Sequence, residues 1–69
     1  MLKEFLQFLA VAKGSCGELR SHLYVGLDEG YLTPAQHAKA SEEAEEVSRM
    51  IAGLMRHLRQ SLMRGRKYR

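Results

Sequence analysis

The chain has 69 residues, a single cysteine, no tryptophan and a formal charge of +3. A domain of this size buries only about 60% of the surface that its unfolded chain exposes, so association would stabilise it. The lone cysteine excludes an internal disulfide framework and favours a reducing compartment, which predicts a cytoplasmic protein. The charge is too small to identify a partner by itself.

The start of the chain could be mistaken for a targeting segment, because Lys3 precedes the apolar run 5–12. Glu4 and Gln7 are poorly placed for a secretory signal, and the helical repeat continues through the supposed cleavage site. A membrane span needs about 20 mostly apolar residues, and the first charge-free run ends at Lys13. We therefore predict no signal peptide and no membrane partner.

The first half of the chain has the repeat of an amphipathic helix, with apolar or small residues at alternating steps of four and three. These residues are Phe5, Leu9, Ala12, Cys16, Leu19, Leu23 and Gly26. The repeat predicts a helix over about 2–29. Glycines within it disfavour the helix by up to about 1 kcal/mol each. Either a neighbouring backbone approaches closely at these positions, or the helix kinks near Gly14.

A turn is predicted between residues 28 and 34. Gly30 suits the left-handed position just past a helix end. Thr33 suits the N-cap, Pro34 the first helical position, and Gln36 completes a Thr-x-x-Gln capping box. These independent signals predict the point at which the chain reverses.

The second half repeats the helical pattern, which predicts a helix over about 34–63 and then a basic C-terminal tail over 64–69. Its seam residues are Ala40, Ala44, Val47, Ile51, Leu54, Leu58 and Leu62. The apolar sector of each helix is wider than one antiparallel neighbour covers. We therefore predict an all-α fold with one domain, 1–69. It is an antiparallel helical hairpin that forms part of an oligomeric up-and-down helix bundle. The predicted core and oligomer residues are Phe5, Leu9, Cys16, Leu19, Leu23, Val47, Ile51, Leu54 and Leu58.

The segment 8–19, read as F-L-x-V-A-x-G-S-x-x-E-L and followed by Gly30-Tyr31-Leu32, carries a family resemblance. It resembles the bacterial four helix bundle proteins, also known as the 23S ribosomal RNA intervening sequence proteins. The resemblance implies an all-α bundle, often a symmetric homo-oligomer, in a family without established enzymatic activity. A related group that contacts a reverse transcriptase and nucleic acid implies, by analogy only, a nucleic-acid adaptor.

The resemblance covers only the second half of the family domain, because the family's first two helices have no counterpart in the sequence. Either two hairpins pair to rebuild four helices, or a partner protein supplies the missing ones. The first alternative predicts a non-enzymatic, homo-oligomeric adaptor for RNA or DNA. The second predicts a purely structural protein-interaction module.

The stretch after residue 55 contains cations and no acid, which suits contact with nucleic-acid phosphates. The predicted binding residues are Arg56, Arg59, Arg64, Arg66, Lys67 and Arg69. Alternatively, these cations only complement the negative pole of the second helix. The acidic run 42–46 lies near the opposite end of that helix. Its carboxylates either interact favourably with the positive pole of the helix or support head-to-tail association between subunits.

No constellation predicts catalysis, a cofactor or a metal. Ser15, Glu18 and His22 share one helix face, but a helix interior offers no backbone amides for an oxyanion hole. Glu18 and His22 are predicted to form a surface pair, and Ser15 to serve contact between helices. Cys16 is predicted to be an inert buried thiol. The three histidines lack metal-ligand spacing with Cys16 or with paired carboxylates.

Overall fold

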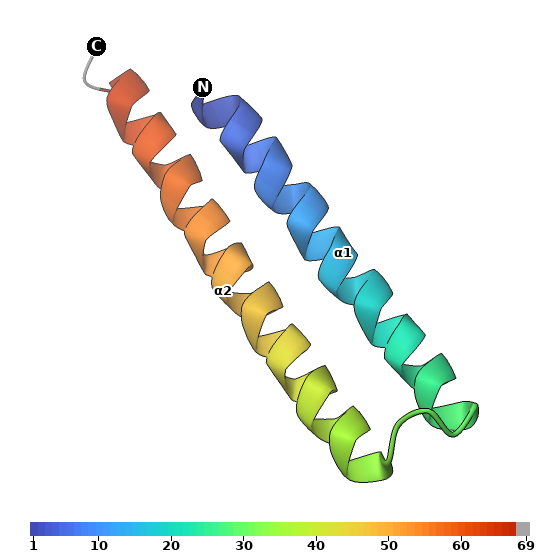
Figure 1. Ribbon diagram of the computed structural model, residues 1–69. Helices are drawn as coiled ribbons and strands as arrows, with labels where there is room; N and C mark the ends of the chain where they lie inside the picture. Colours follow the sequence, from blue (N-terminus) through green and yellow to red (C-terminus); the bar gives the residue numbers. More distant parts are fainter. Residues whose placement is uncertain (68–69) are drawn as a thin grey trace.

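The protein is an antiparallel pair of helices joined by a short turn (Figure 1). The computed structural model describes the backbone of residues 1–67 and the side chains of residues 1–63. Helix α1 comprises Leu2–Asp28 and helix α2 comprises Pro34–Lys67. The start of α1 and the end of α2 lie at the same end of the molecule. The predicted all-α helical hairpin is confirmed.

Helix α2 is longer than predicted, since it continues beyond residue 63 to Lys67. The residues added are rich in cations, which the negative pole of a helix C-terminus favours. Residues 64–67 therefore belong to the helix rather than to a separate tail. Tyr68 and Arg69 lie outside the described residues.

The turn has the predicted chemistry at both of its helix ends. Gly30 has a φ of 81°, and the amide of Tyr31 donates to the carbonyl oxygen of Gly26 at 2.8 Å. At the start of α2, the Gln36 amide donates to the Thr33 hydroxyl at 3.1 Å. The Thr33 amide donates in return to Oε1 of Gln36 at 2.9 Å. Backbone groups at the end of α1 and at the start of α2 thus find hydrogen-bond partners within the turn, which fixes the point at which the chain reverses.

Substitution of Gly30 by alanine is expected to lower the free energy of unfolding by about 1 kcal/mol, because an L side chain is strained in the left-handed region. Gly17→Ala is the matched control. It lies in a helix interior where an added Cβ meets no atom within 4 Å, so it should raise stability by up to about 1 kcal/mol. Urea unfolding followed by circular dichroism, at one protein concentration, measures both. Shifts in the same direction would contradict this account of the turn.

The two helices pack through small and apolar side chains, and the contact is thin. Leu9, Ala44 and Met55 are the buried apolar residues, at 7%, 6% and 6% exposure. Among the described residues, no large side chain is below 2% exposure. Between the helices, an ion pair joins Arg20 to Glu45 at 3.6 Å. Such a core stabilises the hairpin weakly, because two helices enclose little volume.

No backbone approaches the mid-helix glycines of α1 closely, and the helix does not break at them. The helix is continuous through Gly14, so no break is present. An added Cβ at Gly14 or Gly17 would meet nothing within 4 Å, so no neighbouring backbone approaches closely there. At Gly26 the close neighbour is a side chain of the turn, Leu32, at 3.1 Å. The two mid-helix glycines therefore leave open space beside α1.

The hairpin is more extended than a self-contained domain of its length. Its radius of gyration is 16.3 Å, whereas a compact domain of this length has about 11 Å. Its accessible surface is 5667 Å², against about 4,400 Å² for a compact monomer of the same mass. Neither helix, over the residues described, is apolar for long enough to cross a membrane.

Candidate functional site

The predicted core and oligomer residues fall into two groups in the hairpin. Leu9 is buried, and Cys16, Leu23, Ile51 and Leu58 are half-buried between the helices. The other group is open to solvent. It consists of Phe5 at 43% exposure, Leu19 at 49%, Val47 at 41% and Leu54 at 40%. A single helix partner therefore covers only part of each apolar sector.

The exposed apolar residues of the two helices lie on the same face of the hairpin. In both helices an exposed position follows a packed position by three residues, as Leu19 follows Cys16 and Val47 follows Ala44. At about 100° per residue this step rotates both stripes in the same sense. Two antiparallel helices are related by an approximate two-fold axis normal to their common plane, which keeps both stripes on one side.

We call this side the apolar face. It is defined by the exposed side chains of Phe5, Phe8, Leu19, Val47, Met50 and Leu54. Phe8 and Met50, at 67% and 61% exposure, lie toward its edges. Several large apolar side chains exposed on one face are typical of an interaction site.

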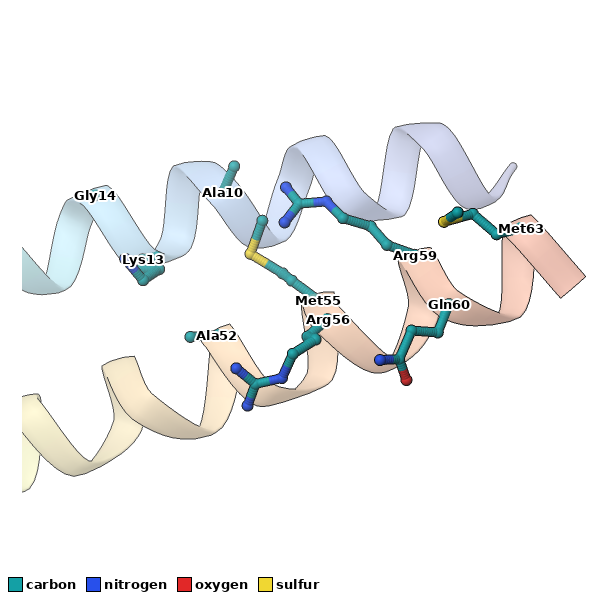
Figure 2. Close-up of a pocket in the computed structure, with 9 residues that line it drawn as sticks. All are labelled: Ala10, Lys13, Gly14, Ala52, Met55, Arg56, Arg59, Gln60 and Met63. Atoms are coloured by element: carbon teal, nitrogen blue, oxygen red, sulfur yellow. The ribbon is translucent and has the colours of Figure 1, made fainter.

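The opposite face carries a groove between the helices, in the half of the hairpin away from the turn. We call it the basic groove, and its volume is about 690 Å³. It is lined by Ala10, Lys13, Gly14, Ala52, Met55, Arg56, Arg59, Gln60 and Met63. Figure 2 shows Met55 and Arg59 extending from α2 toward α1. The groove positions follow packed positions by four residues, as Lys13 follows Leu9, which places them on the face away from the apolar one.

The cations of the basic groove differ from those near the turn. Arg49 and Arg20 pair with Glu45, at 2.7 and 3.6 Å. None of the ion pairs between described side chains includes Lys13, Arg56 or Arg59, and all three are exposed. Positive charge beside the groove is thus available to an anionic ligand.

The remaining predicted nucleic-acid residues extend the same end of α2. Arg64, Arg66 and Lys67 continue the helix beyond the groove, but their side chains lie outside the described residues. Arg69 lies wholly outside them. Arg56 and Arg59, predicted from the sequence to bind nucleic acid, line this groove. Lys13 was not predicted, because the sequence alone does not show which residues of α1 lie beside α2. The signal that could have found it is the shared helical phase of Leu9 and Lys13.

Other sequence features have structural roles. The exposed Ser15 hydroxyl donates to the carbonyl oxygen of Val11 at 3.0 Å, so its hydrogen bond lies within α1 and does not join the two helices. Serine hydroxyls within helices commonly bond to the carbonyl oxygen four residues earlier. Cys16 is a free, half-buried thiol. Among the described residues, no group of three potential ligand side chains could hold a metal ion.

Two contacts near the ends were not foreseen from the sequence. The rings of Tyr24 and His37 lie with centroids 4.6 Å apart, so they join α1 to the first turn of α2. At the chain start, the Met1 ammonium lies 2.6 Å from Glu4 and lowers the pKa of that carboxyl. The first contact joins the two helices near the turn, whereas the second lies within α1.

Comparison with known protein families identifies the family to which the chain belongs. The family model described as 23S rRNA-intervening sequence protein matches residues 1–53. The chain belongs to this family. The match includes the segment that carries the resemblance, and the 23S rRNA-intervening sequence proteins are not a family of enzymes. No curated protein and no solved structure matches the chain significantly.

The family match covers the two faces unequally. It includes nearly the whole apolar face, because only Leu54 of the defining residues lies beyond it. It includes the α1 wall of the basic groove but only Ala52 on the α2 wall. Arg56 and Arg59 thus lie beyond the part of the chain that defines family membership.

Proposed function

We propose that this hairpin is a non-enzymatic subunit of an oligomeric helix bundle that acts as a nucleic-acid adaptor in the cytoplasm. The observation that carries the proposal is the division of the hairpin into two opposite faces, one apolar and one with cations that pair with no described carboxylate. Because the faces are opposite, self-association and anion binding do not compete for the same surface.

The oligomer proposed is a bundle in which the apolar faces of two copies pack together. The accessible surface exceeds that of a compact monomer by about 1,300 Å², while a standard interface buries about 800 Å² on each partner. A two-fold axis brings identical faces together, so the surface need only be complementary to itself. Two hairpins paired in this way supply the four helices of a bundle.

The nucleic-acid role is supported by charge and by position. Arg56 and Arg59 are exposed without an acidic partner among the described side chains. The sequence adds Arg64, Arg66, Lys67 and Arg69 at the same end of the chain. The planar guanidinium group of arginine binds two phosphate oxygens at once. Neutralised phosphates release their counterions, so the affinity depends on salt and has little sequence preference.

Neutralisation of Arg64, Arg66, Lys67 and Arg69 to glutamine is expected to weaken RNA or DNA binding. For every phosphate that is no longer neutralised, the slope of log K against log salt becomes shallower by about 0.7 to 0.9. Fluorescence anisotropy over a salt series measures both effects. Lys39→Gln serves as the control, because Lys39 lies near the turn, at the other end of the hairpin. An equal effect per charge in the control, or no binding by the wild type at low salt, would refute the nucleic-acid role.

A second candidate is a purely structural interaction module, in which a partner protein supplies the remaining helices. The observation that favours it is the apolar face itself, which could accept a foreign helix pair as well as a second copy. A protein that remains a monomer alone, but forms a stable complex with a helical partner and binds no nucleic acid, would support this module over the adaptor.

A further inference from the structure

We infer that the basic groove is a binding site for one unpaired nucleic-acid strand. The inference rests on the nucleic-acid association proposed above and assigns it to a defined surface and a defined form of the polymer. It also adds Lys13 of α1 to the residues that contact the ligand.

The first argument is the placement of charge on both walls of the groove. Lys13 stands on α1, and Arg56 and Arg59 stand on α2. In Figure 2, Arg59 reaches toward α1. A strand lying in the groove would therefore meet cations from both sides, and no described carboxylate pairs with them. Cations on both walls would keep the phosphates of a strand within the groove.

The second argument is the apolar floor. Besides the three cations and Gln60, the lining residues are Ala10, Gly14, Ala52, Met55 and Met63. A ligand that fills the groove must therefore present apolar surface as well as negative charge. A duplex presents phosphates outward and hides the faces of its bases, whereas an unpaired strand exposes those faces for contact with side chains.

The third argument is size. From Ala52 to Met63 the α2 wall is about 16 Å long, at about 1.5 Å per residue. Successive phosphates of one strand lie several ångströms apart, so a wall of this length can contact two or more of them.

Gly14 offers a test that leaves every charge in place. Its added Cβ meets no atom within 4 Å, so a larger side chain would occupy the groove without a clash at its base. Leucine also favours a helix interior more than glycine does. Gly14→Leu should therefore fill the groove while the hairpin stays folded. Gly17→Leu is the matched control, because Gly17 has the same open surroundings but does not line the groove.

The experiment is fluorescence anisotropy with labelled uridine and thymidine decamers and with duplexes of the same length in RNA and DNA. Gly14→Leu is expected to weaken single-strand binding at least tenfold, and Gly17→Leu less than twofold. Lys13→Gln and Arg59→Gln should each reduce the salt slope by about 0.7. Circular dichroism of each variant confirms that the helices remain. The RNA and DNA arms show which polymer is preferred.

The outcomes separate this inference from the proposed function. If the wild type binds none of these polymers, both fail. If the wild type binds, and if neutralisation of Arg64, Arg66, Lys67 and Arg69 weakens binding while Gly14→Leu does not, the adaptor role stands and the groove assignment is overturned. Duplex binding as tight as single-strand binding also overturns it. So does displacement of the decamer from the groove by an acidic helical peptide with higher affinity.

Discussion

Replacement of Leu54 by glutamate is expected to dissociate the proposed two-fold bundle and leave a helical monomer or a partly unfolded chain. Leu54 lies on the apolar face at 40% exposure. A carboxylate there would be buried without a partner when two faces meet, at a cost of several kcal/mol. In a two-fold assembly the substitution occurs on both copies. The dissociation constant should rise at least about a thousandfold, which corresponds to about 4 kcal/mol.

Sedimentation velocity over a dilution series measures this shift, and Tyr31→Glu provides the control. Tyr31 is also a large apolar side chain, but it lies in the turn at 84% exposure, outside the apolar face. The control should sediment like the wild type. Because glutamate suits a helix nearly as well as leucine, loss of assembly by Leu54→Glu could not be attributed to helix propensity. An unchanged assembly would show that the apolar face is not an interface.

The second large effect is expected at Leu9, which is buried between the helices at 7% exposure. Truncation of a buried leucine to alanine costs about 2 to 5 kcal/mol, because the side chain no longer packs and a cavity remains. In a domain of this size each kcal/mol shifts the melting temperature by about 4 to 8 °C. Leu9→Ala should therefore lower the melting temperature by about 10 °C or more.

Thermal unfolding by circular dichroism measures this effect, with all variants at one concentration because assembly contributes to apparent stability. Val25→Ala is the control. It removes a similar apolar side chain from α1 at a position with 57% exposure, so its effect should be within about 0.5 kcal/mol. Equal melting temperatures for the two variants would mean that Leu9 does not form the core described above.

The sequence was sufficient to predict the hairpin because its signals are local. The capping box at Thr33 and Gln36 and the left-handed Gly30 act within a few residues. The apolar repeat identifies helices without reference to a partner. The end of α2 was placed too early, since a run of cations looks like a tail although a helix C-terminus favours it.

The two faces could not be predicted from the sequence because they depend on how the helices face each other. Phe5 and Leu9 belong to one repeat, yet one is half open to solvent and the other is buried. A slightly different rotation of α1 would exchange their environments. The basic groove likewise requires Lys13 of α1 and Arg59 of α2 to line one groove, although 46 positions separate them in the sequence. Periodicity gives the width of an apolar sector but not the part that a neighbour covers.

The mass of the wild-type protein in solution tests the central claim most directly. We expect sedimentation equilibrium to give two chains or more at micromolar concentration, with a melting temperature that rises as concentration rises. Both results follow if the apolar face is covered by another copy. A folded single chain whose melting temperature is independent of concentration would contradict the account, since the hairpin would then be stable with that face in water.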